Sequence, residues 1–205
     1  MGDHRVFAMI LAAGQSRRMG RPKQMLPYGE GTMLEAVLDA VLESSVDGLV
    51  VVGDPPTAAF LAGHLPERCF VAVNDDPGSE MLSSAKIGLS TIETEFTPAS
   101  EDGVMVLPGD QPQISGGTIT TCAETYRLPR HPPGILIATY RGRRGHPTIF
   151  SVEMLREIEG WSDDHGLNEL ARRHPEAVRE LAITMGAMPI DVNTPEDYDR
   201  LCGRS

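Results

Sequence analysis

The sequence predicts an α/β fold, a single doubly wound and mostly parallel sheet flanked by helices. Short apolar runs alternate with helix-length segments, and the runs are continuous rather than alternating in polarity. Continuous runs are typical of strands that are covered on both faces, as parallel strands are. The 205 residues, 40% of them hydrophobic, suit one domain with a sizeable core. The expected strands are Val6–Leu11, Gly48–Val52, Phe70–Val73, Val104–Leu107 and Ile135–Tyr140.

The segments between these strands are expected to be helical, because their apolar residues recur at helical spacing. The expected helices are Met33–Glu43, Thr57–Leu65, Met81–Ile92, Thr118–Tyr126, Val152–Glu159 and Leu167–Arg173. A glycine- and arginine-rich turn, Gly142–Phe150, is expected to end in a strand at Pro147, and Arg179–Ile183 is expected to add another. Ligands of such sheets bind at the carboxyl ends of the strands, so functional residues are expected in the turns that follow them.

Composition excludes several classes of protein. A net charge of −11 argues against a nucleic-acid binder, which gains affinity by neutralising phosphates. No apolar run approaches the roughly 20 residues of a membrane span, and Met1–Arg5 is too short and polar for a secretory signal. Cys69, Cys122 and Cys202 are far apart and lack C-x-x-C spacing, which predicts neither disulfides nor a metal cluster. We therefore expect a cytoplasmic protein without nucleic-acid or membrane partners.

The turn after the first strand concentrates positive charge. Four cations fall within seven residues of an acidic chain, namely Arg17, Arg18, Arg21 and Lys23. Successive backbone N–H groups in such a glycine-containing turn form a concave anion site. The segment Leu11–Lys23 therefore predicts a triphosphate site, with a solvated basic turn as the alternative. The fingerprint G-x-G-x-x-G is absent, since Gly14 is followed by Gln15, and this disfavours a nicotinamide-dependent dehydrogenase.

Two later turns offer oxygen ligands for a metal ion. Asp110 follows the fourth strand in the segment Pro108–Pro112, where a side chain would project into the ligand crevice. Carboxylate oxygen suits Mg²⁺, but an ordinary turn aspartate before the helix after Ser115 is an equal alternative from spacing alone. Asp191 and Asn193 stand two apart, on one side of an extended chain. Thr194, Pro195 and Asp197 then predict a capped helix start.

The remaining candidate residues have weaker support from local pattern. Asn74 offers both a donor and an acceptor, as base recognition requires, and Ser83 and Ser84 would lie in the first turn of a helix. Local pattern alone favours a plain loop and a capped helix there. Gly145-His146-Pro147 and Asp164-His165-Gly166 each contain a histidine, although a lone histidine is more often packed than catalytic.

Taken together, these motifs resemble the molybdenum cofactor cytidylyltransferases, which are related to the guanylyltransferases. The resemblance rests on Leu11-Ala12-Ala13-Gly14 with its basic residues, Gly109-Asp110-Gln111-Pro112, the Met-x-x-Ser-x-x-x-Gly-Leu segment at Met81, Gly-His-Pro at Gly145, and the segment around Asn193-Thr194-Pro195. It implies a Rossmann-like nucleotidyltransferase fold. It also implies Mg²⁺-dependent transfer of CMP from CTP to the terminal phosphate of molybdopterin, with release of pyrophosphate. A recipient molybdoenzyme is a further partner that the resemblance suggests.

The resemblance also implies roles for individual residues. Residues 1–112 would mainly bind the nucleotide and 113–205 the second substrate. Lys23 would neutralise charge at the α-phosphorus, Arg18 would hold the leaving pyrophosphate, and Asp110 would bind Mg²⁺ with Asp191 or Asn193. The nucleotide would contact Leu11, Ala12, Ala13, Gly14, Arg18, Lys23, Asn74, Ser84 and Asp110. The second substrate would contact Arg144, Gly145, His146, Pro147 and Asp164.

The sequence departs from the family pattern at four places. Ser162-Asp163 replaces the glycine that usually precedes the segment at Asp164. Asn193 replaces an aspartate, which removes a charge and resembles the guanylyltransferase branch. Glu80 stands where glycine is usual. Asn168 stands where arginine is usual, so Arg143 or Arg144 would replace that charge, or the second substrate differs. The alternatives are therefore a GTP-using enzyme, an NTP transferase acting on a sugar or alcohol phosphate, and a non-enzymatic carrier that delivers finished cofactor to a molybdoenzyme.

Overall fold

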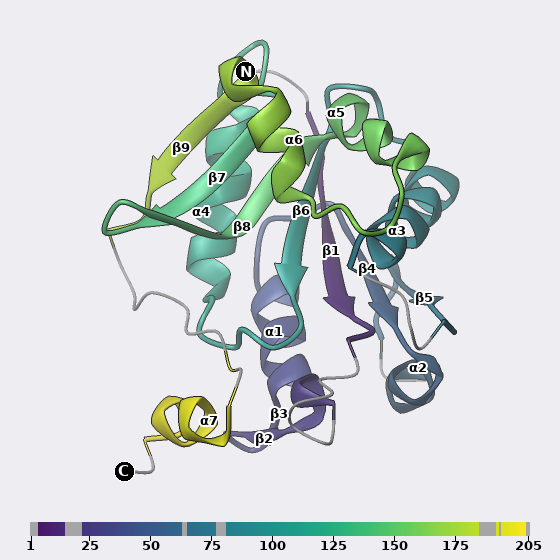
Figure 1. Ribbon diagram of the computed structural model, residues 1–205, viewed down its shortest axis with the longest axis vertical. Coiled ribbons are helices and arrows are strands. Elements are labelled where there is room, and N and C mark those ends of the chain that lie inside the picture. The colour runs from purple at the N-terminus through teal and green to yellow at the C-terminus, as the bar shows by residue number, and fades with distance from the viewer. Residues whose placement is uncertain are drawn as a thin grey trace.

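A seven-stranded sheet forms the centre of the protein (Figure 1). The computed structural model describes residues 4–14, 22–62, 65–76, 81–184, 192 and 194–203. The strand order is β5-β4-β1-β6-β8-β7-β9. The strands are β1 (Val6–Ala12), β4 (Gly48–Gly53), β5 (Cys69–Val73), β6 (Gly103–Pro108), β7 (Ile135–Tyr140), β8 (Arg143–Ser151) and β9 (Val178–Ala182). Every strand expected from the sequence is present, and the ends shift by a few residues.

Strand direction explains where ligand-binding turns gather. β5, β4, β1 and β6 are parallel neighbours, and β7 pairs with β9 in parallel. β8 alone among the sheet strands runs antiparallel to both of its neighbours, β6 and β7. The turns after β1 and β6 therefore meet at one edge of the sheet, and the start of β8 reaches the same edge.

The structure corrects the expected turn at Gly142. The strand begins at Arg143, and Tyr140 pairs with Arg143 directly across the hairpin. Arg141 and Gly142 both have positive φ, 51° and 75°, as a two-residue hairpin turn requires. Two arginines expected in the turn, Arg143 and Arg144, therefore lie on an extended strand, because the tight turn pairs them with Tyr140 and Thr139 of β7. The register of this pairing shifts farther along, between Thr139 and Ile137.

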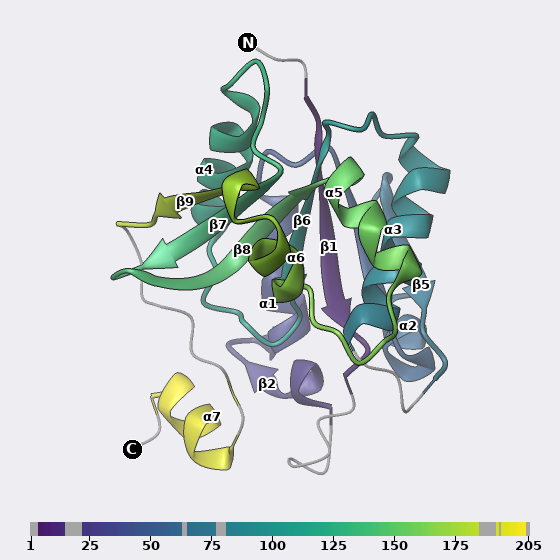
Figure 2. The same ribbon diagram turned by 45° about the horizontal axis from the view of Figure 1, so that its top comes forward.

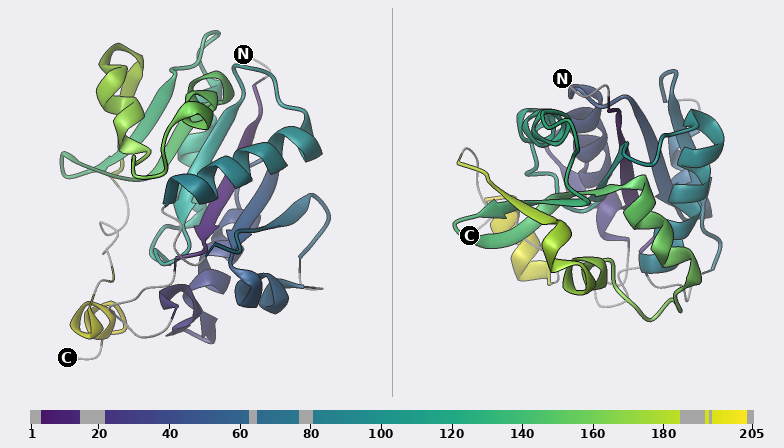
Figure 3. Two further views of the ribbon diagram at one scale, coloured as in Figure 1. Left: turned by 45° about the vertical axis from the view of Figure 1, so that its right-hand side comes forward. Right: turned by 90° about the horizontal axis from the view of Figure 1, so that it is seen from above.

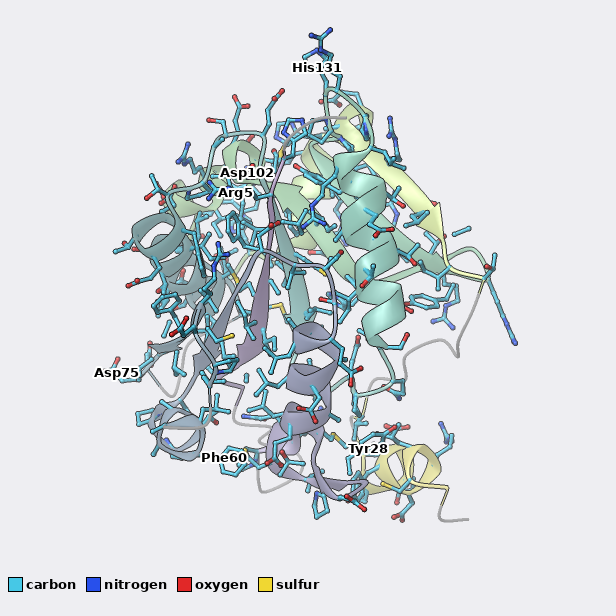
Figure 4. The ribbon with its side chains drawn as sticks, turned by 180° about the vertical axis from the view of Figure 1, so that it is seen from behind. Arg5, Tyr28, Phe60, Asp75, Asp102 and His131 are labelled. Atoms are coloured by element: carbon cyan, nitrogen blue, oxygen red, sulfur yellow. The ribbon has the colours of Figure 1, made fainter. Side chains whose placement is uncertain are left out.

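Helices cover both faces of the sheet. They are α1 (Met33–Leu42), α2 (Pro55–Leu61), α3 (Met81–Phe96), α4 (Gly116–Arg127), α5 (Val152–Arg156) and α6 (Asn168–Arg173). A further helix, α7 (Pro195–Leu201), lies away from the sheet (Figure 2). Ala8 and Ile10 of β1 pack in one core with α1 and α4, and Phe7 and Met9 pack in a second with α3, α5 and α6. Figure 4 shows α1 and α4 on the rear face. Strands apolar on both sides are thereby buried on both sides.

Local side chains explain the helix ends. Asp54 accepts from the backbone of Thr57, so α2 begins two residues before the expected Thr57. α3 extends past Ile92 to Phe96, whose ring stacks on Phe7 at 4.9 Å. The expected helix Val152–Glu159 continues from α5 into a 3-10 turn, η3 (Glu157–Gly160). The capping box predicted at Thr194 and Asp197 is confirmed.

A small assembly below the sheet was not expected. Another 3-10 turn, η2 (Lys23–Met25), leads into a hairpin of β2 (Pro27–Tyr28) and β3 (Gly31–Thr32). The Tyr198 hydroxyl of α7 donates to the Pro27 carbonyl at 2.6 Å. Figures 2 and 3 show α7 set apart from the sheet, on the side of β2. The C-terminal helix thus packs near the chain that follows the basic turn.

The end of the sheet opposite these turns is held by a buried carboxylate. Asp102 is 3% exposed and accepts from the backbone and Nε of Arg5 and from the backbone of Ala99, at 2.9 to 3.1 Å. The Arg5 guanidinium also donates to the carbonyls of Phe96 and Thr97. Figure 4 shows Arg5 and Asp102 side by side. The pair joins the start of β1 to the end of α3 and the start of β6.

We expect Asp102→Ala to lower the free energy of unfolding by about 2–3 kcal/mol, because buried donors lose a charged acceptor. Urea denaturation measures the change. Glu93→Ala is the matched control: it removes the partner of Arg156 in an exposed ion pair of 2.7 Å. That pair is expected to contribute about 0–1 kcal/mol. Equal losses in the two variants would contradict the assignment.

Candidate active site

A cavity of about 170 Å³ lies where β1 and β6 end. Leu11 of β1 is level with Pro108 of β6, and the Gly109 backbone donates to the Leu11 carbonyl at 2.9 Å. A Cβ on Gly109 would lie 3.0 Å from that of Ala12, so this close approach favours glycine. The lining residues are Leu11, Ala12, Ala13, Gly14, Gln24, Met81, Ser84, Val106, Pro108, Asp110 and His146.

Many of the predicted nucleotide residues are thus brought together. Asp110 shares this cavity with the turn after β1, as the sequence predicted. Ser84 lines it as well, and accepts from the Asn74 side chain at 3.0 Å. Asn74 is 4% exposed and, among the described residues, does not line the cavity itself. Its backbone donates to the Gly53 carbonyl, so Asn74 ties β4 to the start of α3 behind the cavity wall.

Gln24 is a lining residue that sequence reasoning missed. Its side-chain amide, in a residue 4% exposed, donates to the Ala12 carbonyl at 2.6 Å. This bond holds η2 against the end of β1. Lys23 is the residue immediately before Gln24, so its backbone lies next to the cavity lining. Lys23 is itself outside the lining set of the described cavities. An uncharged residue within a basic stretch carries no charge signal, which is why the sequence did not single it out.

A second, larger cavity of about 660 Å³ adjoins the first. The two share Met81, Val106 and His146. Four of the residues expected to contact the second substrate, Arg144, Gly145, His146 and Asp164, line the larger cavity, whereas Pro147 is not among its described lining residues. The remaining lining residues are Ile137, Thr148, Phe150, His165, Gly166, Leu167, Asn168, Ala171 and Arg172. Sequence reasoning could not tell the apolar strand residues Ile137 and Phe150 from the core, because cavity and core residues occupy the same apolar runs of β7 and β8.

Charges of both signs surround the larger cavity. Arg144 pairs with Glu180 at 2.8 Å, and Arg172 with Glu169 at 3.4 Å. A hydrogen bond from Ser162 lowers the pKa of Asp164, which stays ionised at neutral pH. Asn168 and Arg172 stand one helical turn apart on α6 and both line the cavity. Arg172 thus supplies a cation near Asn168, and Arg144, one of the two arginines expected to replace the missing charge, lines the same cavity.

Three predicted site residues, Arg18, Asp191 and Asn193, lie outside the residues that the structure describes. Their roles stay predictions. Within the described part of the chain, no three His, Cys, Asp or Glu side chains gather as a metal site. Asp110 lines the smaller cavity, and a carboxylate is a ligand that suits a hard cation bound together with triphosphate.

Tyr140 holds the boundary between the cavities. Its hydroxyl donates to the His146 carbonyl at 2.7 Å, and a Cβ on Gly145 would lie 3.3 Å from its ring. Burial raises the pKa of Tyr140 to about 12, so the hydroxyl remains a donor at neutral pH. The clamp therefore fixes the backbone of His146, a residue common to both cavities.

We expect Tyr140→Phe to raise the KM for the second substrate about threefold to tenfold, because His146 loses a backbone anchor while the ring stays packed. The KM for nucleotide should change less than twofold. Tyr126→Phe is the control, since its buried hydroxyl donates to the Glu101 carbonyl away from both cavities. Steady-state kinetics with each substrate varied in turn checks both variants, and equal KM shifts in the two would contradict the clamp.

A MobA-like NTP transferase domain matches residues 8–178, which include most of β1, all of β6, the turns that follow them and the lining residues of both cavities. The chain belongs to the MobA-like NTP transferase family. The doubly wound, mostly parallel fold and the resemblance to the molybdenum cofactor nucleotidyltransferases are thereby confirmed.

Relatives of this transferase carry different names. It is 30% identical over 206 residues to nicotine blue oxidoreductase of Paenarthrobacter nicotinovorans, with 96% of each chain covered. It is 24% identical to molybdenum cofactor cytidylyltransferase of Escherichia coli (strain K12), covering 94% of this chain and 93% of that one. A crystal structure of Rv0371c from Mycobacterium tuberculosis H37Rv superimposes with a TM-score of 0.80 at 31% identity, covering 98% of each chain. A manganese complex of that protein superimposes with a TM-score of 0.77 at 30% identity, covering 98% of this chain and 100% of that one.

The family assignment makes the transferase a nucleotidyltransferase. None of the helices in the described part of the chain has the length and apolar character needed to cross a bilayer.

Proposed function

We propose that this transferase moves CMP from CTP to the terminal phosphate of a molybdopterin-type cofactor and releases pyrophosphate. The observation that carries the proposal is the pair of adjoining cavities, which meet at His146, Met81 and Val106. The smaller cavity lies on the glycine turn and would hold the nucleotide phosphates. The larger one would hold the second substrate. Residues 1–112 and 113–205 then act mainly on one substrate each, although Met81 and His146 each line both cavities.

The chemistry needs alignment more than acid–base catalysis. A phosphate oxygen of the second substrate forms a bond to the α-phosphorus, the bond to the bridging oxygen breaks, and pyrophosphate leaves with the electron pair. The attacking phosphate is anionic near neutral pH, so no general base is required. Catalysis then comes from holding the two substrates in line and from neutralising charge on the phosphoryl oxygens. Lys23 would act on the α-phosphoryl group and Arg18 on the leaving pyrophosphate.

A divalent cation, Mg²⁺, belongs to the proposal. Asp110 would hold it, with Asp191 or Asn193 completing the ligands of the protein. The ion would neutralise phosphate charge and help orient the triphosphate. The oxygen donor in the smaller cavity and the manganese complex of the related Rv0371c protein support this part.

Similarity to a protein named nicotine blue oxidoreductase favours a second candidate, an oxidoreductase. The nicotinamide-dependent dehydrogenase considered in the sequence analysis is the form of it that can be tested. The larger cavity, with its apolar residues Val106, Ile137 and Phe150, has room for a ring system in either case. The missing G-x-G-x-x-G fingerprint weighs against dinucleotide binding on the first turn. Within the same family, a guanylyltransferase and an NTP transferase acting on a sugar or alcohol phosphate remain alternatives.

A two-part experiment separates these functions. Thermal-shift measurements with CTP, GTP, UTP, ATP, NADH and NADPH, each with Mg²⁺, show which ligand stabilises the protein. A ligand at 100 times its Kd adds about 2.7 kcal/mol. A pyrophosphate-release assay with molybdopterin then tests transfer. We expect CTP to give the largest shift and the fastest release. A larger response to GTP would indicate the guanylyltransferase. NADPH oxidation without pyrophosphate release would indicate the oxidoreductase.

A further inference from the structure

One wall of the larger cavity has no regular structure. It is the segment of residues 161–167 between η3, which ends at Gly160, and α6, which begins at Asn168. Four consecutive residues of this segment line the cavity, namely Asp164, His165, Gly166 and Leu167. The position of the segment therefore sets the shape of the cavity.

A lysine from another helix holds this segment. Lys86 of α3 donates from Nζ to the Trp161 carbonyl at 2.6 Å and to Oδ1 of Asp163 at 2.7 Å. The Lys86 side chain is 26% exposed and that of Asp163 is 51% exposed, so the bond to the Trp161 carbonyl is the more shielded of the two. Figures 1 and 2 show the segment that enters α6 running alongside α3.

The other polar contacts of the segment are local. Among the described residues, its remaining hydrogen bonds join partners no more than three positions apart, such as Ser162 with Asp164 and with His165. Arg173 covers the Trp161 ring at 4.2 Å, but this contact comes from the adjoining α6. Lys86 is thus the described hydrogen-bond donor that ties the segment to a distant element, 75 and 77 positions away in sequence.

The same helix reaches the nucleotide cavity. Ser84, two residues before Lys86, lines the smaller cavity, and Met81 lines both. α3 packs against β4 and β1 through Leu82, Ala85 and Leu89, so it is a rigid support. Because Lys86 lies on this helix, its bonds would hold residues 161–167 at a set distance from the nucleotide cavity.

We propose that Lys86 is a positioning residue for the second substrate: by holding residues 161–167 against α3, it sets the affinity of the larger cavity. The proposal rests on the assignment of that cavity to the second substrate of the proposed transfer reaction. It gives Lys86 no contact with the reacting atoms.

The test compares Lys86→Met, which keeps most of the apolar stem and loses the donors, with Lys86→Arg, which keeps charge and donors. With molybdopterin and Mg-CTP, we expect Lys86→Met to raise the KM for molybdopterin about tenfold. The KM for CTP should stay within about twofold, and Lys86→Arg should recover most of the loss. An unchanged KM for molybdopterin, or equal increases in both KM values, would overturn the proposal.

The matched control is Arg156→Met. It breaks another ion pair of α3, between Arg156 and Glu93 at 2.7 Å, whose members do not line either cavity. We expect its two KM values to match those of the wild type. An increase in the KM for molybdopterin as large as that of Lys86→Met would show a general effect of loosening α3 and would overturn the proposal.

Hydrogen exchange keeps the proposal testable if the transfer reaction itself is wrong. In Lys86→Met without ligands, amides of residues 161–167 should exchange at least about tenfold faster than in the wild type, with α3 and the sheet unchanged. Unchanged exchange in residues 161–167 would overturn the anchoring role whatever the enzyme catalyses. Absence of pyrophosphate release in the wild type, with faster exchange in the variant, would instead overturn only the proposed function.

Discussion

Asp110→Asn is expected to lower kcat for pyrophosphate release at least about a hundredfold, because it removes the anionic oxygen that would hold the metal beside the triphosphate. Asp110 lines the smaller cavity at the end of β6, opposite the glycine turn after β1. An asparagine of the same shape retains one oxygen but no charge, so residual activity should need a higher concentration of Mg²⁺. The measurement is pyrophosphate release over a Mg²⁺ titration.

Asp54→Asn is the matched control for this variant. Asp54 also follows a parallel strand, β4, but it caps α2 and does not line either described cavity. Asparagine caps helices as well as aspartate does, so the control should retain activity and stability. Full activity of Asp110→Asn at low Mg²⁺ would remove Asp110 from the metal site.

Lys23→Ala is expected to cut kcat by about a hundredfold or more, equivalent to about 2.7–4 kcal/mol of transition-state stabilisation, with little change in the KM for CTP. The reason is that the ammonium group would act on charge that develops at the α-phosphoryl oxygens. Gln24 supports this placement, since its bond to Ala12 holds η2 beside the end of β1. Single-turnover and steady-state kinetics measure the effect.

The other lysine of the chain, Lys86, provides an internal comparison for Lys23. Removing either one lowers the net charge by the same amount, so an effect of overall charge would be shared. We expect the two variants to change different kinetic constants. Lys23→Ala should lower kcat, whereas Lys86→Met should raise the KM for the second substrate. Near-normal turnover of Lys23→Ala would refute its catalytic role.

Local sequence pattern was enough to predict the strands and their order along the chain. β1, β4, β6 and β7 are continuous apolar runs, and each is buried along nearly its whole length. Helix ends were harder to predict, because they depend on single capping residues such as Asp54 and on tertiary contacts such as that of Phe96 with Phe7. The hairpin of β2 and β3 carries only two residues in each strand, too few for a periodic signal.

By itself, the sequence determined the doubly wound fold, the glycine turn after β1 and the aspartate after β6, since each depends on residues that are neighbours along the chain. Only the tertiary structure decided that β8 runs antiparallel beside β6, and this brings His146 to the boundary of both cavities. It also decided which groups the side chains of Gln24, Tyr140 and Lys86 donate hydrogen bonds to. The physical reason is that a hydrogen bond such as that from Lys86 to Asp163 joins groups 77 positions apart, whose meeting depends on how whole elements pack.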